Sequence, residues 1–151
     1  MAAGLPYDSD AGRDYAACVT AIMCGEAYLQ SSRIAELCEP LAPITDTVQT
    51  RLGVTTAENM PGAACPGWYI NREPFLDVIR MHRASVNNIG SARVGTGVSP
   101  VQAERSSAAA QLSELIEASK QCWDEALAHG EKHGYRNSQV TVLTPPAPSA
   151  S

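Results

Sequence analysis

The spacing of apolar residues predicts a first long helix near the start of the chain. Its candidate N-terminal caps are Asp8, Ser9 and Asp10. Apolar or small side chains then recur with a period near 3.6 up to about Cys38. They are Tyr15, Val19, Ile22, Met23, Ala27 and Ile34. We expect Pro40 and Pro43 to end this helix.

A second helix is expected after an irregular segment. Residues 39–69 mix Pro, Gly, Thr and Ala without a sustained period, which is typical of irregular structure. Asn71 can cap the helix that follows, and Pro74 lies early enough in it to be tolerated. One face carries Phe75, Ile79, His82 and Val86. We expect this helix to end near Asn87 and Asn88.

The third helix has the clearest pattern of the three. Its apolar stripe, at i, i+3 and i+4 spacing, is Leu112, Leu115, Ile116, Ser119, Cys122, Trp123, Ala126 and Leu127. Lys132 and His133 lie near its negative end, and Gly134 can take the left-handed conformation that stops a helix. Residues 139–143, QVTVL, predict a short strand that pairs with strands outside this chain. The fold class is therefore α/β, a mostly α-helical fragment with a terminal β-strand.

Composition and charge exclude several classes of protein. The net charge is −5 and no block of Lys or Arg is present, which argues against a nucleic-acid partner. No apolar run approaches the length of a membrane span, and the start, MAAGLPYDSDAGRD, is typical of neither a signal peptide nor an anchor. The five cysteines include no C-x-x-C pair, so we expect reduced thiols in the cytoplasm.

The histidines do not predict a metal site. His129 and His133 have the i, i+4 spacing of a metal-binding pair, but they lack the intervening Glu of a zincin helix and a third ligand. His82 shares no such spacing with a cysteine or a carboxylate. We therefore expect no metal.

The remaining reactive groups have simple structural interpretations. Cys18, Cys24 and Cys122 lie in helices beside apolar residues, where a thiol usually acts as a small buried hydrophobic group. The acidic candidates are Asp124, Glu125 and Glu131. They are more simply exposed helix residues than an acid/base pair, because no pocket is indicated around them.

Four segments, read in order, resemble the later part of the catalytic subunit of adenosylcobalamin-dependent (class II) ribonucleotide reductases. They are GLPYDSDAGR, TAIMCGEAY, NREPFLDVIRMHR and WDEALAHGEKHGYRNSQVTVL. The resemblance makes residues 1–143 a segment of the catalytic barrel domain, and it weakens between about residues 39 and 65. Residues 144–151 diverge from the family and are expected to form a disordered tail.

The resemblance implies a fold and a chemistry. The fold is a ten-stranded α/β barrel, and the reaction replaces the ribose 2′-OH by hydrogen with adenosylcobalamin as cofactor. The implied partners are a ribonucleotide and a dithiol reductant such as thioredoxin, and the resemblance leaves open whether the enzyme is a monomer or a homodimer. In the family, the radical-forming cysteine, the reducing cysteine pair and the Asn and Glu near them all precede the equivalent of Gly4. None of the five cysteines here matches those motifs, so no catalytic residue is carried over.

The end of the chain departs from the family at its phosphate loop. The family continues as Pro-Thr-Gly-Thr-Ile, whose hydroxyl and N–H donors near a helix start receive the substrate phosphates. Here Thr144 and Pro145 are followed by residues 146–151, PAPSAS, so Pro145 is the only remnant of that substrate-binding loop. Deleting one base from a GC-rich coding sequence for TPTGTIS yields TPPAPSA. A single-base deletion is one explanation of this tail, and an ordinary disordered terminus is the other.

Two functions follow from these patterns. In the first, the chain is a segment of a ribonucleotide reductase that lacks the radical site and is inactive alone. In the second, it is a helical remnant or interaction module with no activity.

Overall fold

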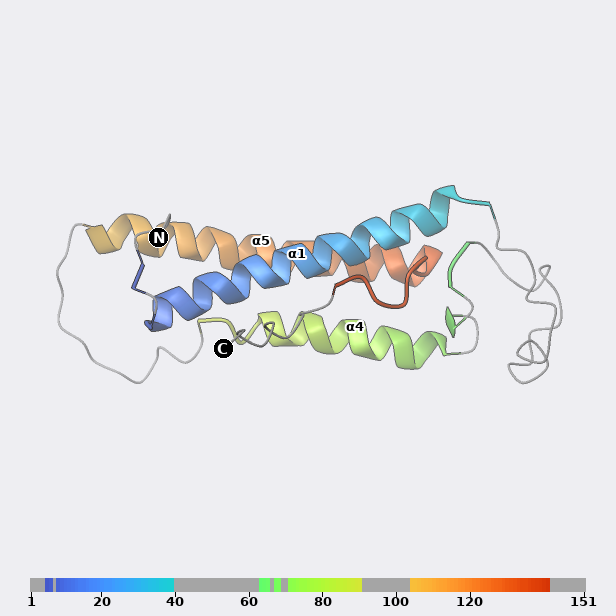
Figure 1. The fold of residues 1–151 in the computed structure, drawn as a ribbon, viewed down its shortest axis with the longest axis horizontal. Helices are drawn as coiled ribbons and strands as arrows, with labels where there is room; N and C mark the ends of the chain where they lie inside the picture. The colour runs from blue at the N-terminus through green and yellow to red at the C-terminus, as the bar shows by residue number, and fades with distance from the viewer. Residues whose placement is uncertain are drawn as a thin grey trace, which may run out of the picture.

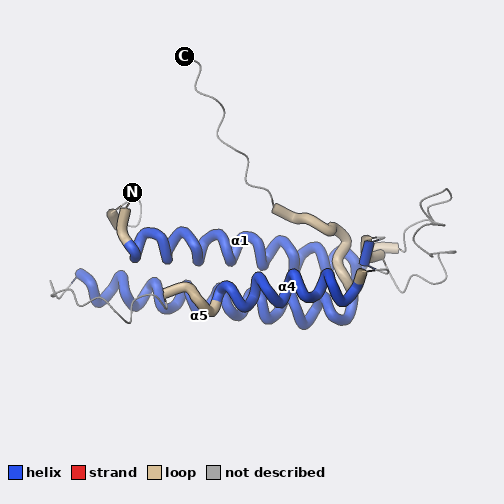
Figure 2. The backbone as a smooth tube through the Cα atoms, turned by 90° about the horizontal axis from the view of Figure 1, so that it is seen from below, coloured by secondary structure: helices blue, strands red, loops and turns tan. Residues whose placement is uncertain are grey.

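The described part of the chain forms a bundle of three helices. The computed structural model describes residues 5–6, 8–39, 63–65, 67–68, 71–90 and 104–141. Helix α1 spans Asp10–Leu37, α4 spans Arg72–Val86 and α5 spans Glu104–His133. Figure 1 shows that α1 and α5 run side by side in the same direction, whereas α4 runs back along them. The view from below in Figure 2 shows the same elongated arrangement.

The predicted ends of α1 are confirmed. Ser9 is the N-cap, and its Oγ accepts a hydrogen bond of 3.0 Å from the N–H of Gly12. At the other end the N–H of Cys38 donates to the carbonyl of Ile34 at 3.0 Å. The helix therefore ends before Pro40, which lies with Pro43 outside the described residues.

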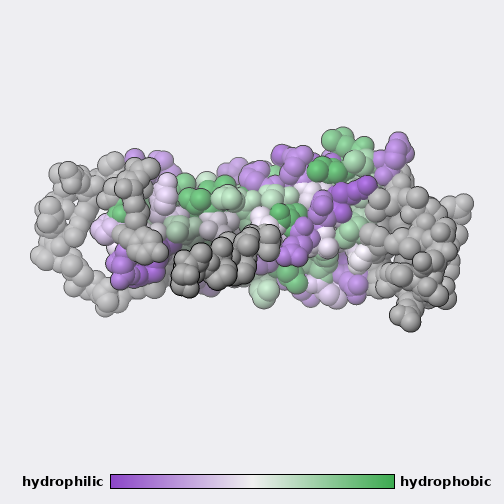
Figure 3. All heavy atoms as spheres, in the orientation of Figure 1, coloured by the Kyte–Doolittle hydropathy of each residue, from purple (hydrophilic) through white to green (hydrophobic). Residues whose placement is uncertain are grey.

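The apolar stripe of α1 is not the buried face of the helix. Its buried residues are Cys18, Gly25, Tyr28, Leu29, Ser31, Ser32 and Ala35. Residues of the predicted stripe, such as Val19 and Met23, are exposed instead, Met23 by 64%. Helix α5 approaches α1 closely at Gly25, where an added Cβ would lie only 2.7 Å from Cys122 Sγ. This position therefore needs a small residue, and Tyr28 and Leu29 pack into the core one turn further along. Figure 3 shows hydrophobic surface toward the C-terminal end of α1, where Leu37 is 81% exposed.

The prediction for α4 is largely confirmed. Ile79 and Val86 are buried together with Leu76, which the pattern missed, and the helix ends at Asn87. Asn71 occupies the N-cap position, but its side chain makes no capping hydrogen bond, so this part of the prediction is wrong. The N–H of Asn71 donates to the carbonyl of Gly67 at 2.9 Å, so the chain already turns helically before it and the backbone is not extended as a cap requires.

Helix α5 matches its predicted stripe and its predicted stop. The buried members of the stripe are Leu112, Ser119, Cys122, Trp123 and Ala126. Gly134 follows the last turn with φ of 72°, the left-handed conformation that glycine adopts without steric cost. Its N–H donates to the carbonyl of Gly130 at 2.8 Å and closes the helix end.

The predicted strand is absent from those of its residues that the structure describes. Residues 139–141 are not in a strand, and Val142 and Leu143 lie outside the described residues. Among the described residues all regular structure is helical, so the α/β barrel stays an expectation. The physical reason is that an isolated strand cannot satisfy its backbone N–H and C=O groups without neighbouring strands.

Candidate functional site

The G-Y-R-N segment after α5 turns the chain back into the core. Tyr135 is fully buried, and its hydroxyl donates to the carbonyl of Ala126 at 2.8 Å. A Cβ at Gly130 would lie 2.1 Å from the Tyr135 ring, so the helix needs a glycine where that ring packs. Burial raises the pKa of Tyr135, which argues against a role in proton transfer near neutral pH.

Aromatic rings from three other segments surround Tyr135. Tyr28 of α1 and Trp68 each meet its ring edge-on at 5.6 Å, and Phe75 of α4 stacks on it at 5.2 Å. Trp68 belongs to the stretch that the sequence marks as irregular, yet it is 4% exposed. The C-terminal end of this irregular segment, at Trp68, is therefore part of the core.

The next two residues of the segment tie it to distant parts of the chain. The N–H of Arg136 donates to the carbonyl of Ser31 at 3.1 Å, and its Nη1 donates to the carbonyl of Ala63 at 3.0 Å. The N–H of Asn137 donates to Ser31 Oγ at 2.9 Å. The segment thus fixes where the chain leaves the bundle toward residues 139–143, and its visible role is positioning.

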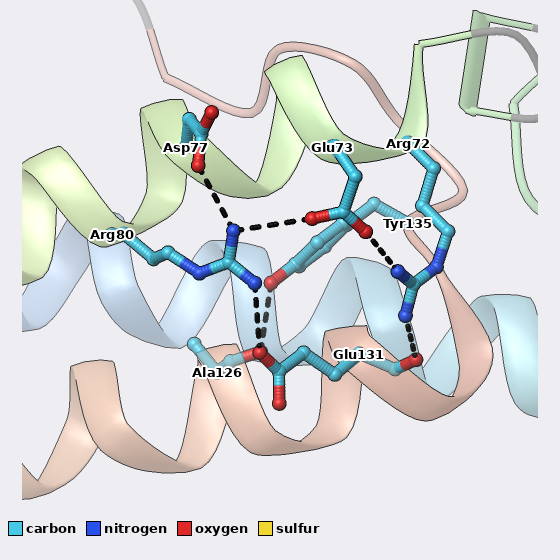
Figure 4. Close-up of polar contacts among 7 residues, drawn as sticks. All are labelled: Arg72, Glu73, Asp77, Arg80, Ala126, Glu131 and Tyr135. Carbon is cyan, nitrogen blue, oxygen red and sulfur yellow. Dashed lines mark hydrogen bonds and ion pairs between the residues drawn. The ribbon is translucent and has the colours of Figure 1, made fainter.

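A network of charged side chains joins α4 to α5 on the surface. Figure 4 shows Arg80 between Asp77 Oδ1 at 2.9 Å and Glu131 Oε1 at 3.2 Å, while Arg72 reaches the carbonyl of Glu131 at 2.9 Å. Glu73 pairs with both arginines. All these side chains are substantially exposed, so each pair stabilises the fold only slightly.

The acidic residues of α5 are confirmed as exposed helix residues. Asp124 pairs with Arg83 of α4, and Glu131 belongs to the network around Arg80. Glu125 accepts a hydrogen bond from Gln121 at 2.9 Å, one turn away on the same helix. These contacts are structural and give no acid/base pair.

A mostly apolar cavity of about 480 Å³ lies between the three helices. Its lining includes Ala17, Ala21, Cys24, His82, Val86 and Trp123. The imidazole of His82 stacks on the Trp123 indole at 5.3 Å, and the buried Nε1 of Trp123 has no hydrogen-bond partner. The cavity has the size of a small-molecule site but few converging polar groups.

The buried cysteines are not activated nucleophiles. Cys18 and Cys122 are buried as predicted, whereas Cys24 is half-buried. Burial and the nearby Glu26 carboxylate raise the pKa of the Cys122 thiol to about 12, and burial raises that of Cys18. A raised pKa lowers the thiolate fraction and with it the nucleophilicity.

Two histidines of α5 meet a carboxylate of α1 at the end of the bundle. Glu36 Oε2 lies 3.2 Å from His129 Nε2, and Glu36 Oε1 lies 3.5 Å from His133 Nε2. Sequence reasoning found the two histidines but missed Glu36, because it is distant in sequence and no local pattern marks it. The remaining candidate, Pro145, lies outside the described residues.

Comparison with known proteins places the chain in a family. The family described as ribonucleotide reductase, barrel domain, matches residues 1–151. The chain therefore belongs to the ribonucleotide reductase barrel-domain family.

No helix among the described residues is long and apolar enough to cross a membrane.

Several relatives carry a more specific name. Proteins called vitamin B12-dependent ribonucleotide reductase from Agrobacterium fabrum, Bradyrhizobium diazoefficiens and Rhodopirellula baltica are 36%, 34% and 33% identical to this chain over 96% of its residues. The chain spans only 9–10% of their length. No solved structure shows a significant match.

Proposed function

We propose that the chain is a helical segment of the catalytic subunit of an adenosylcobalamin-dependent ribonucleotide reductase. The observation that carries this proposal is the match to the B12-dependent relatives over 96% of the chain. The substrate would be a ribonucleotide, the reductant a dithiol protein such as thioredoxin, and the compartment the cytoplasm. The full-length enzyme would supply the radical chemistry, because no cysteine here matches a catalytic motif.

The segment's contribution is to position the chain that leads toward the substrate loop. Tyr135 anchors the turn in the aromatic core, and Arg136 and Asn137 bind the backbone and side chain of Ser31. These contacts fix the start of residues 139–143, which lead to the phosphate-loop remnant at Pro145. Positioning of this kind supplies much of the rate in an enzyme.

The described residues do not fit adenosylcobalamin. The corrin ring, its amide arms and the adenosyl group present many hydrogen-bonding groups, whereas the polar groups that line the cavity between the helices are few, chiefly Thr20, His82 and Ser85. The buried Trp123 Nε1 is the one orphaned polar side-chain atom among the described residues. We therefore derive no step through the cofactor from this segment.

The outer face of α1 supports the assignment to a larger protein. Tyr15, Val19 and Met23 form an exposed apolar row at i, i+4 spacing, and Leu37 extends the apolar surface at the helix end. Since the relatives are about ten times longer, we infer that the rest of the barrel domain covers this row in the full-length enzyme.

A segment exchange tests the proposal. In the Agrobacterium fabrum relative, the matching segment is replaced either by residues 4–143 of this chain or by residues 4–151. We expect deoxynucleotide formation from the first chimera, because it keeps the relative's own phosphate loop. The second chimera should lose activity, because residues 146–151 displace the loop donors.

The chain alone provides the complementary assay. We expect no deoxynucleotide formation from the 151-residue chain with ribonucleotide, adenosylcobalamin and dithiol. Turnover that is abolished by Cys18→Ala or Cys122→Ala would overturn the proposal, as would a folded but inactive chimera carrying residues 4–143. Sequencing the coding DNA tests the single-base deletion, which requires a T-G-T-I reading once a base is restored after the Pro145 codon.

A further inference from the structure

We propose that Glu36, His129 and His133 form a binding site for a divalent transition-metal ion, with Zn²⁺ as the best fit. The three side chains come from two helices and meet near the ends of both, Glu36 near the end of α1 and the histidines in the last turns of α5. This inference does not depend on the proposed function. The sequence argued against a metal because a third ligand was missing, and α1 supplies that ligand.

The distances between the ligand atoms suit a tetrahedral ion. Ligands about 2.0–2.1 Å from a tetrahedral zinc lie roughly 3.3 Å from one another. The two Glu36 oxygens lie 3.2 Å from His129 Nε2 and 3.5 Å from His133 Nε2. One ligand atom from each residue can be chosen so that all lie within 4.8 Å of one another, and the two imidazole centres are 4.6 Å apart. These separations are close to those of ligands around one tetrahedral ion.

A hydrogen bond behind the site orients one of the ligands. Ser32 Oγ lies 2.8 Å from His129 Nδ1, and Ser32 is fully buried. When Nδ1 carries the proton and donates to this hydroxyl, the lone pair of Nε2 points toward Glu36 and is free to bind a metal. Such outer partners are a regular feature of metal-bound histidine, because they fix the tautomer and the ring orientation.

The surroundings favour a cation and let it enter. Helices α1 and α5 run in the same direction, so their C-terminal ends, which carry negative partial charge, lie together at this end of the bundle. The side chains are partly exposed, 25% for His129, 31% for His133 and 43% for Glu36, which leaves a path for the ion. Two imidazoles and one carboxylate leave a fourth position for water.

The ligand types decide which metal is expected. Imidazole nitrogen suits Zn²⁺, Co²⁺, Ni²⁺ and Cu²⁺, whereas Mg²⁺ and Ca²⁺ prefer sites made only of oxygen. A set of two histidines and one glutamate is also a known arrangement for zinc with an open position. The site would connect the ends of α1 and α5, so bound metal should raise the thermal midpoint of the chain.

Cobalt binding to the 151-residue chain tests the proposal, because the spectrum of Co²⁺ reports its ligands. We expect visible d–d bands of a four-coordinate site without a thiolate-to-cobalt charge-transfer band, and displacement of Co²⁺ by Zn²⁺. Glu36→Gln, His129→Gln and His133→Gln should each lower the affinity at least about 100-fold. Ser32→Ala should lower it about 10-fold, at the lower end of the range for an outer partner.

Matched controls separate the site from general effects. Glu117→Gln changes an exposed glutamate of α5 and His82→Gln changes the histidine outside the cluster, so both should bind cobalt like the wild type. Circular dichroism checks that each variant keeps its helices. Absence of cobalt binding by the wild-type chain, a thiolate charge-transfer band, or undiminished binding by the three ligand variants each overturns the proposal.

Discussion

Helices α1 and α5 are similar in length but distribute their apolar residues differently. Helix α5 directs its apolar stripe inward, with Leu112, Trp123 and Ala126 buried and acidic residues such as Asp124 and Glu125 outside. Helix α1 buries Tyr28 and Leu29 beside small or polar residues such as Ser31 and Ser32, and it exposes a second apolar row. A surface helix normally has one apolar face, so α1 has the pattern of a helix that is covered on two sides.

The difference follows from how closely the two helices approach. Ser119 Oγ donates to the carbonyl of Cys18 at 3.3 Å, and Cys122 Sγ donates to that of Ile22 at 3.7 Å. The close approach at Cys122 leaves no room for a side chain at Gly25, where an added Cβ would lie 2.7 Å from Cys122 Sγ. The contact between α1 and α5 therefore combines a close fit at Gly25 with the apolar packing of Tyr28 on Trp123.

Thiol reactivity should show the largest contrast between the inside of α5 and the outside of α1. Cys122 is buried with a pKa raised to about 12, whereas Cys38 after α1 is exposed. At pH 8 the thiolate fraction of Cys122 should be lower than that of an ordinary thiol by a factor on the order of 1000. Alkylation followed by mass spectrometry should modify Cys38 first. Cys122 should become more reactive as the pH is raised, since its raised pKa keeps it protonated at neutral pH, and equal rates at pH 8 would contradict the burial of Cys122.

The next largest effect is expected for Trp123 of α5. Trp123→Ala should lower the free energy of unfolding by about 3–5 kcal/mol, because the indole is 2% exposed and packs against Tyr28 and His82. Tyr15→Ala removes a partly exposed aromatic side chain of α1 and should cost much less. Urea unfolding followed by circular dichroism measures both. Similar losses in the two variants would mean that the faces of α1 and α5 are not as different as described.

A smaller effect is expected at the glycine that ends α5. Gly134→Ala should cost about 2–4 kcal/mol, since the residue has φ of 72° and an added Cβ would lie 2.8 Å from Ala64 Cβ and from Trp68 Nε1. Gly67→Ala is the matched control, because nothing lies within 4 Å of its added Cβ. Thermal unfolding of the two variants gives the comparison. An unchanged midpoint for Gly134→Ala would refute the left-handed helix stop.

The smallest effect is expected on the outer face of α1. Met23→Gln should change the free energy of unfolding by less than about 0.5 kcal/mol, because the side chain is 64% exposed in this chain. The same substitution in the full-length enzyme should cost more if the barrel domain covers this face. Equal small effects in both proteins would show that the row stays exposed.

Periodicity predicted α5 well because its core contacts are made by large apolar side chains. It failed for the buried face of α1, where Gly25, Ser31 and Ser32 are buried by fit and by hydrogen bonds, which hydropathy does not detect. Gly134 was predictable from its place after the last helical turn. Trp68 was not, since it lies in a stretch without a period and is buried by rings from other segments.

The candidate metal ligands show the same limit of sequence reasoning. The spacing of His129 and His133 is local and could be read from the sequence. Their meeting with Glu36 depends on the pairing of α1 with α5, which no local pattern encodes. The hydrogen bond between His129 Nδ1 and Ser32 Oγ depends on the same pairing.

The parallel arrangement of α1 and α5 also has a consequence for synthesis on the ribosome. The contact between Cys18 and Ser119 joins residues 101 positions apart, so α1 must wait for its main partner while that length of chain is made. At about 5–20 residues per second the wait is roughly 5–20 s, which is long compared with helix formation. During that time both apolar faces of α1 are open to other chains. Within this segment, α1 is therefore the expected site of chaperone binding or aggregation during synthesis.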